Sequence, residues 1–221
     1  MTSSMVNIGL FSIRARQFVQ AGITGLLLAS LVWLKPASAD NVNPAGPPAE
    51  FVQAVANNAL EAVKNDEQVR GGDRKAIVQA VNTFLMPYVN FEKTTRLAAG
   101  RHWRTASEQQ RTDLVDAFKN TLIRTYSGAL AQVDDKTKLD ILPFRGDPNA
   151  DDVVVRSSLT QSSGSPIGVD YRLEKTPEGW RVYDLNVEGI WLIQNYRNQF
   201  SEQITQNGID GLIKALNAQA Q

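Results

Sequence analysis

The spacing of apolar residues changes once along this chain, near Lys136. From Leu114 to Leu130 an apolar or aromatic residue recurs at every fourth position. From Ile167 to Leu173 apolar residues instead occupy every second position. A helical interval predicts an amphipathic helix, and strict alternation predicts an antiparallel strand with one covered face. The chain is therefore expected to fold as helices followed by a sheet, an α+β arrangement.

Capping and breaking residues divide the helical part. The proline pair ending at Pro48 predicts the start of the first helix, and the glycine pair beginning at Gly71 predicts its end. Asp73 can cap a second helix that stops at Pro87, and Asn90 can cap a short third one. The stretch TASEQQR then predicts the longest helix.

In that stretch Thr105 is expected to be the cap, with Glu108 reaching back to it as in a capping box. After this helix, four β-rich runs cover residues 137–144, 151–160, 167–175 and 179–187, and turn-forming sequences separate them. Closing helices are expected over about 190–206 and 209–218, with Asn207-Gly208 between them. The predicted domain is a curved four-stranded antiparallel sheet packed against helices.

The fourth β-rich run contains a change of parity. Its apolar positions shift from Trp180 and Val182 to Leu185 and Val187. A β-bulge near Tyr183-Asp184 would produce this shift and would bend the sheet.

The first 39 residues have the composition of a secretory signal peptide. They contain no acidic residue, place Arg14 and Arg16 before an apolar run, and end in Ala-Ser-Ala at Ala39. We expect cleavage after Ala39, a flexible leader at 40–48 and a single domain at 49–221. A retained membrane anchor is the alternative, but the run of about 17 residues is at the lower limit for a span.

Composition argues against several classes of function. The chain has no cysteine, which excludes disulfides, and a single histidine, His102, which excludes a Cys/His zinc site. Residues 40–221 carry 20 basic and 23 acidic side chains, a net charge of −3, which disfavours nucleic acid and anionic lipid surfaces as partners. No serine-hydrolase turn or phosphate-binding loop occurs. We therefore expect no metal, no catalytic residue and no enzymatic activity.

The segment from Gly179 to Phe200 has more apolar side chains than one face of a strand or helix can use. A curved sheet under helices can either fill its interior with such side chains or enclose a cavity. The residues alone leave both possibilities open.

Two segments, Leu85–Leu130 and Gly179–Leu212, resemble the signature regions of the MlaC family, the periplasmic phospholipid-binding proteins also called toluene-tolerance proteins. The most specific pieces are "LMPYV", "YD…EG" and the "NYR…F" helix. The resemblance covers nearly all of the chain from about Phe51. One departure is Trp191, which stands where a small residue is common in the family.

This resemblance implies a soluble periplasmic shuttle that helps to maintain outer-membrane lipid asymmetry. It would exchange phospholipid between an outer-membrane lipoprotein–porin complex and an inner-membrane ABC transporter with an MCE ring. The acyl tails would lie in an apolar cavity between the sheet and the helices, with the headgroup near solvent. We expect a monomer without a cofactor.

The expected lipid-lining residues share an inward-facing pattern and lie near the matching motifs. They are Phe84, Leu85, Phe91, Leu97, Phe118, Leu122, Tyr126, Val155, Val169, Tyr171, Leu185, Val187 and Ile190. Arg197 can meet a lipid phosphate, with a surface salt bridge as the alternative role. Asp184 and Glu188 are expected to hold the strand-to-helix corner.

Two rival functions remain open from the residues. One is an exported enzyme of a cone-shaped α+β fold that acts on an apolar small molecule. Its acid and base would have to come from a short set of side chains: Asp170, Asp184, Glu188, Tyr183 and His102. The other is a structural adaptor with a solid core.

Overall fold

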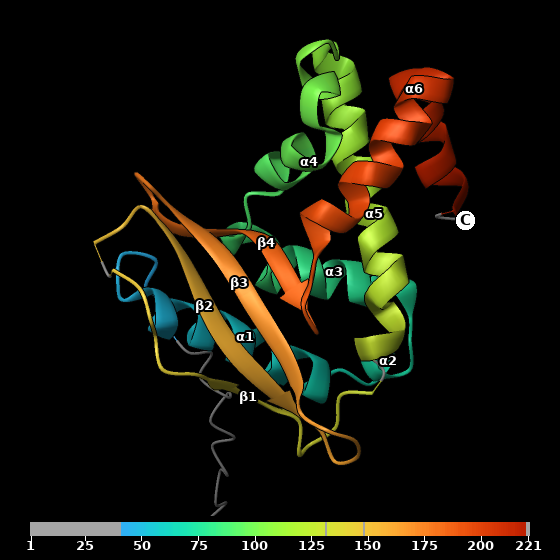
Figure 1. The fold of residues 1–221 in the computed structure, drawn as a ribbon. Coiled ribbons are helices and arrows are strands. Elements are labelled where there is room, and N and C mark those ends of the chain that lie inside the picture. Colours follow the sequence, from blue (N-terminus) through green and yellow to red (C-terminus); the bar gives the residue numbers. More distant parts are fainter. Residues whose placement is uncertain (1–40, 131, 148, 220–221) are drawn as a thin grey trace, which may run out of the picture. The chain divides into compact units, whose positions relative to one another are not determined.

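The structure is a computed structural model that describes residues 41–130, 132–147 and 149–219 (Figure 1). These residues all belong to the unit Ser38–Gln221. The predicted signal peptide and its cleavage site lie outside the described residues. No helix in the described part of the chain is long and apolar enough to cross a bilayer.

Helices form the first half of the fold and its end. They are α1 (Pro48–Asn65), α2 (Glu67–Arg70), α3 (Arg74–Phe84), the 3₁₀ helix η1 (Met86–Tyr88), α4 (Phe91–Ala99), the 3₁₀ helix η2 (Gly100–Arg104), α5 (Glu108–Leu130) and α6 (Leu192–Gln219). The predicted caps are confirmed, because the Asp73 carboxylate accepts from the Ala76 N–H at 2.8 Å and the Asn90 side chain accepts from the Lys93 N–H at 3.0 Å. Helix α1 begins at Pro48, as predicted.

The capping box of α5 lies two residues after its predicted position. The Ser107 hydroxyl accepts from the Gln110 N–H at 3.2 Å, and the Gln110 side-chain carbonyl accepts from the Ser107 N–H at 3.0 Å. The Thr105 hydroxyl instead donates to the His102 carbonyl and closes η2. The assignment of Thr105 and Glu108 was therefore wrong, because the preceding 3₁₀ turn already uses the threonine.

The sheet has five antiparallel strands in the order β1-β2-β3-β4-β5. They are β1 (Lys138–Ile141), β2 (Asp152–Thr160), β3 (Ile167–Thr176), β4 (Gly179–Val187) and β5 (Ile190–Trp191). The four predicted strands are present, but the count of four was wrong. Ile190, expected to begin a helix, lies in the additional strand. Glu188 and Gly189 both have positive φ, at 52° and 85°, and make the two-residue turn that folds Ile190 back onto Val187.

The predicted bulge in β4 is confirmed. Arg172 of β3 lies opposite Asp184, whereas Leu173 lies opposite Val182, so Tyr183 is the extra residue. Because one extra residue reverses the alternation, Leu185 and Val187 face the same side of the sheet as Val182. The predicted break in the closing helices is also confirmed, since Gly208 has non-helical angles (φ 71°, ψ 176°) inside α6.

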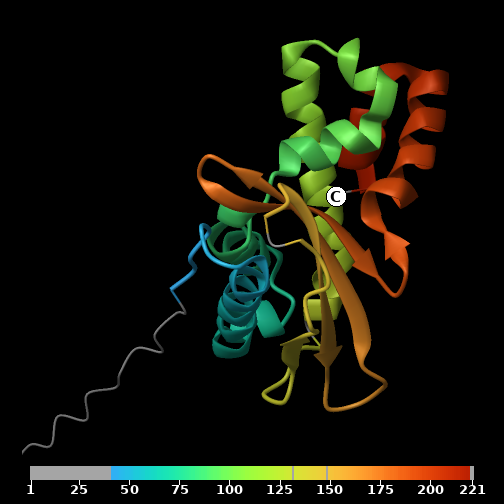
Figure 2. The ribbon, with the colours of Figure 1, turned by 60° about the vertical axis from the view of Figure 1, so that its left-hand side comes forward.

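The helices lie in two places relative to the sheet. Helices α1 and α3 run along one face of it, whereas α4, α6 and the first part of α5 stand together beyond one end (Figures 1 and 2). A first cluster of buried side chains, which we call the sheet cluster, joins α1 to the sheet: Phe51, Val52, Val55, Val153, Val155, Leu173, Trp180 and Val182. A second, the helical cluster, joins α4, η2, α5 and α6: Ala98, Ala99, Trp103, Leu114, Ala117, Phe118, Phe200, Ile204, Leu212 and Leu216.

The segment before α1 contacts the first residues of β4. The Pro44 carbonyl accepts from the Trp180 N–H at 2.8 Å, and the Gly46 carbonyl accepts from the Trp180 indole N–H at 3.0 Å. The expected mobility of residues 40–48 stays a prediction, but their described part makes specific contacts with the domain.

Gly179 is the position where this contact should tolerate a side chain least. Its φ is +106°, and an added Cβ would collide with the Pro44 carbonyl, whereas Gly164 has a φ of +94° and open space around it. We expect Gly179→Ala to lower the free energy of unfolding by about 3 kcal/mol, and Gly164→Ala by about 1 kcal/mol from backbone conformation alone. Urea denaturation of both variants measures the difference. Equal losses would show that the contact with Pro44 contributes nothing.

Candidate functional site

One face of the sheet is mostly apolar from one end to the other, and we call it the apolar sheet face. The strand registers place on it Val153, Val155, Ser157 and Leu159 of β2, Ile167, Val169, Tyr171 and Leu173 of β3, and Trp180, Val182, Leu185 and Val187 of β4. Most of these side chains are apolar; Ser157 is polar, and Lys175, which lies opposite Trp180 with its Nζ 5.9 Å from that ring, places an exposed charge beside the closed end. The bulge at Tyr183 is what brings the last two residues of β4 onto this face.

Burial changes from one end of the apolar sheet face to the other. At the closed end Val155 is 1% exposed, Leu173 is fully buried and Trp180 is 2% exposed, because Phe51 and Val52 of α1 pack over them. At the open end the covering is incomplete. Leu159, Ile167, Val169, Tyr171 and Leu185 are only half-buried there.

The exposure is greatest where β4 turns into β5. Val187 is 38% exposed and Ile190, at the tip of the hairpin, is 63% exposed. Apolar area left in water costs roughly 25 cal/mol per Å². A contiguous apolar surface of this kind, beside a well-packed cluster, is typical of a binding site.

Helices α3 and α5 also have partly exposed apolar side chains. Val81, Phe84 and Leu85 at the end of α3 are half-buried, as are Leu122 and Ile123 of α5. Tyr126, one turn further along α5, is 44% exposed. The sheet cluster and the cluster formed by α2, α3 and Val63 of α1 are separate groups of buried residues.

The polar atoms at the open end are paired within the protein. The Ser157 hydroxyl donates to the Val169 carbonyl at 2.9 Å. Burial raises the pKa of Tyr171 above its ordinary value, opposed by a hydrogen bond with Ser157, so the phenol is neutral at physiological pH. The open end therefore offers hydrocarbon and a neutral phenol to a ligand.

Asp184 of the "YD…EG" motif holds the corner between β4 and α6, as predicted, whereas Glu188 ties the turn after β4 to β3. The buried Asp184 carboxylate accepts from the backbone N–H groups of Leu185 and Ile193, both at 3.0 Å, and from an Arg172 Nη at 3.0 Å. The Glu188 carboxylate accepts from the Gly168 N–H at 2.6 Å. Burial raises the pKa of Asp184, while the Ile193 N–H and the Arg172 charge oppose that rise.

Trp191 lies on the other side of the sheet. Its ring is 3.8 Å from the Arg172 guanidinium. Arg172 follows Tyr171 in β3, so it points to the face opposite the apolar one. The tryptophan that departs from the family motif therefore covers an ion pair, and it does not narrow the open end.

The predicted lining residues fall into separate groups. Val155, Val169, Tyr171, Leu185 and Val187 share the apolar sheet face, and Leu85 packs against the sheet cluster. Phe118 lies in the helical cluster, with its ring centroid 5.5 Å from that of Phe91, and Leu122 packs against the same cluster. Phe84 borders a surface pocket of 420 Å³ between α1 and α3.

Arg197 has a partner within the protein. Its Nε and one Nη donate to the Leu97 carbonyl at 3.0 and 2.9 Å, which ties α6 to the last turn of α4. Sequence reasoning missed Leu159 and Ile167, which lie opposite each other at the open end. Their positions continue the alternation of Val153–Val155 and of Val169–Tyr171, and that signal was available in the sequence.

Removing the charge of Arg172 should make stability depend on the ionisation of Asp184. We expect Arg172→Gln to lower the free energy of unfolding at pH 7 by about 2 kcal/mol, because a buried carboxylate loses its partner. A raised pKa means that the native state binds the proton more tightly, so the loss should shrink as the pH falls toward about 5. Urea titrations at both pH values measure this. Lys138→Gln, from the exposed pair with Asp140, is the control and should change little at either pH. A loss that stays constant with pH would contradict the assignment.

Comparison with known proteins agrees with this geometry. A solved phospholipid-binding protein from Ralstonia solanacearum, in complex with a phospholipid, superposes with a TM-score of 0.76 at 38% identity and covers 79% of this chain and 97% of its own. Toluene tolerance protein ttg2D of Pseudomonas putida is 25% identical over 74% of this chain and 75% of its own length. The intermembrane phospholipid transport system binding protein MlaC of Haemophilus influenzae is 23% identical over 78% and 82%. The model of the MlaC protein family matches residues 53–218, and the chain belongs to that family.

Proposed function

We propose that this protein binds a phospholipid by its acyl tails and carries it as a soluble shuttle across the periplasm. The observation that carries the proposal is the decrease in burial along the apolar sheet face, from 1% exposure at Val155 to 38% at Val187. Side chains of the sheet cluster bury one half of this face, and the other half keeps exposed apolar surface that a ligand can cover.

The energetics require such a surface in any carrier. Two acyl chains contain roughly 28 methylenes, and exposing each to water costs about 0.8 kcal/mol, or on the order of 20 kcal/mol in total. A shuttle can take lipid from a membrane complex only if the apolar contacts in its own site offset most of that free-energy cost. The affinity then comes from the tails, and we expect the choice of headgroup to be weak.

The relatives support the choice of ligand. The Ralstonia solanacearum protein was solved with a phospholipid, and it is 38% identical to this chain in a match that covers 79% of this chain. The Haemophilus influenzae relative is named for intermembrane phospholipid transport. Export through a cleaved signal peptide, and exchange with an inner-membrane MCE-type ABC transporter and an outer-membrane lipoprotein–porin complex, are parts of this proposal.

The tails should contact the open end of the sheet first. There Val169, Tyr171, Leu185 and Val187 are incompletely covered, and Ile190 extends the surface at the hairpin tip. Tyr126 lies on α5 with nearly half of its surface exposed. Phe118 and Val155 are fully packed, so contact with lipid at those positions requires the clusters around them to open.

The geometry gives less support to the enzyme alternative. Asp184 is bonded to two backbone N–H groups and to Arg172, and Glu188 is bonded to the backbone of Gly168. The Tyr183 hydroxyl donates to the Asp152 carboxylate at 2.8 Å, and burial raises the pKa of Tyr183 further. These groups hold the fold together, and a general acid or base needs a proton that it can exchange.

Native mass spectrometry of protein purified from its own periplasm tests the function. We expect adducts with the mass of a phospholipid that disappear when the protein is denatured. Protein without any lipid adduct, both as purified and after incubation with phospholipid vesicles, would refute the proposal.

A charge at the open end should weaken lipid retention without unfolding the domain. We expect Val187→Glu to reduce the retention of a fluorescent phosphatidylethanolamine by at least about tenfold, because the carboxylate must be desolvated against the tails. Its stability should change by less than about 1 kcal/mol, since the side chain is already 38% exposed. Leu142→Glu is the matched control, at a residue that is 43% exposed outside the apolar sheet face. Equal lipid loss in both variants would contradict this placement of the site.

A further inference from the structure

The outer edge of β2 is unpaired over half of its length. Strand β1 pairs only with Ser157–Thr160 of β2, and one further hydrogen bond runs from the Leu142 N–H to the Arg156 carbonyl at 2.9 Å. After Leu142 the chain leaves the edge and returns only at Asp152. Residues 152–155 of β2 therefore have β3 on one side and no strand on the other.

The direction of the backbone groups along this edge follows from two hydrogen bonds. The Asp151 carbonyl accepts from the Lys175 N–H, on the side of β3, whereas the Arg156 carbonyl accepts from Leu142 on the opposite side. Because backbone groups alternate along a strand, Val154 directs both its N–H and its carbonyl outward. Among the described residues, no backbone hydrogen bond meets either group of Val154 or the N–H of Arg156.

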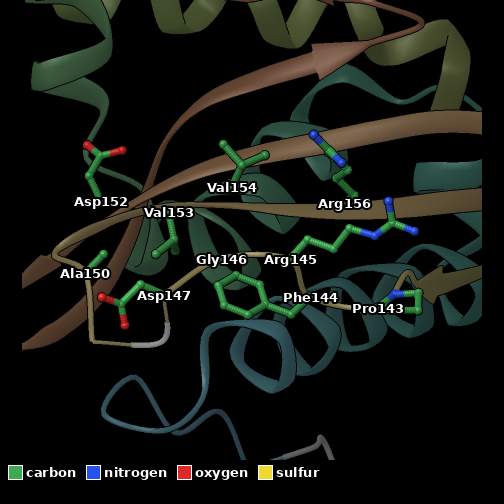
Figure 3. Close-up of a pocket in the computed structure, with 10 residues that line it drawn as sticks. All are labelled: Pro143, Phe144, Arg145, Gly146, Asp147, Ala150, Asp152, Val153, Val154 and Arg156. Atoms are coloured by element: carbon green, nitrogen blue, oxygen red, sulfur yellow. The ribbon is translucent and has the colours of Figure 1, made fainter.

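A pocket lies along this unpaired edge. It has a volume of 280 Å³ and is bordered by residues 143–147 and Ala150 on one side and by Val153, Val154 and Arg156 on the other (Figure 3). Phe144 anchors the loop by packing against the sheet cluster, and Gly146 has no room for a side chain against that ring. The loop is thus held beside the edge without pairing to it, although loops commonly protect such edges.

The arginines and the carboxylates of this pocket lie at different ends, and Asp147, whose carboxylate accepts from the Asn149 N–H at 2.9 Å, takes part in no ion pair among the described residues. Arg145 and Arg156 take part in no ion pair among the described residues, and their guanidinium groups lie at the opposite end of the pocket from Asp147 and Asp152 (Figure 3). The Asp152 carboxylate already accepts from the Tyr183 hydroxyl and lies 3.8 Å from the Lys93 Nζ. Two arginines near one another favour a carboxylate between them.

We propose that this pocket binds an extended acidic segment of a partner protein as an additional strand on β2. The segment would pair its backbone with Val154 and Arg156, and its Asp or Glu side chain would lie against Arg145 and Arg156. Backbone pairing supplies affinity in this mode of recognition, and the charged pair sets the register. This site lies at the sheet edge beside the closed end, away from the open end of the apolar sheet face, so it would let a partner bind the protein without contacting its lipid.

The edge geometry disfavours a second copy of this chain as the occupant. Each copy has its own residues 143–147 beside the edge, so two β2 edges would have to approach past two such segments. A free inorganic anion would use the arginines but would leave the edge N–H and carbonyl groups of Val154 unpaired. An extended peptide uses both features.

Selection from a displayed library of random heptapeptides tests the proposal. We expect the enriched peptides to combine β-branched residues with an Asp or Glu at one fixed position. The leading synthetic peptide should bind the full protein in fluorescence anisotropy. Val154→Pro removes the outward N–H at an edge, where proline is tolerated, and should abolish that binding. Arg145→Gln with Arg156→Gln should weaken it by at least about tenfold.

Arg101→Gln with Arg104→Gln, on the exposed side of η2, is the charge-matched control and should leave peptide binding unchanged. The same peptide N-methylated at alternate amides should not bind, which tests the edge even if Val154→Pro fails to fold. No enriched acidic peptide, or equal binding to all variants, would overturn the proposal. A dimer that Val154→Pro dissociates in light scattering would overturn it in favour of a second copy. Phospholipid retention should be unchanged in every variant, so the outcome is independent of the proposed shuttle function.

Discussion

Burial along the apolar sheet face falls from the complete cover of Leu173 to the partial exposure of Val187, because α1 packs over only one half of that face. The covered half holds the helix and the sheet together. The less covered half has the same chemistry, and several of its side chains keep part of their apolar surface exposed. The same apolar face therefore contributes to stability where α1 covers it and to the proposed ligand binding where α1 does not.

The polar residues near this surface hold the strands and helices around it in position. Asp184 joins β4, the start of α6 and Arg172, so the curvature of the sheet and the direction of α6 are fixed at one buried carboxylate. Lys93 of α4 performs a similar task, because it bonds Glu174 of β3 at 2.7 Å and lies over the Tyr183 ring of β4. Neither group reaches the apolar sheet face. These charged side chains therefore fix the positions of α4 and α6 relative to the sheet without contacting the open end.

The sequence allowed the α+β order, the helix caps at Asp73 and Asn90 and the bulge at Tyr183 to be predicted, because each leaves a local signal in period or residue type. The strand at Ile190 was missed, since two residues are too few to show a period. The partner of Arg197 was also out of reach. It is a carbonyl at Leu97, and only the packing of α4 against α6 brings the two together. Likewise, alternation shows which residues face inward but does not show where a helix stops covering them, so the open end could not be separated from the core.

The bulge in β4 has a consequence for how this family can vary. Because Tyr183 is the single residue that reverses the alternation, the lengths of the segments on its two sides are independent only in steps of two. Loss or gain of one residue between Tyr183 and the hairpin would move Leu185 and Val187 to the opposite face of the sheet. It would also place the polar side chain of Asn186 on the apolar sheet face. Length changes in related chains should therefore accumulate in the loops that join the strands, whereas the spacing from Trp180 to Gly189 should be held by selection even where the residues themselves differ.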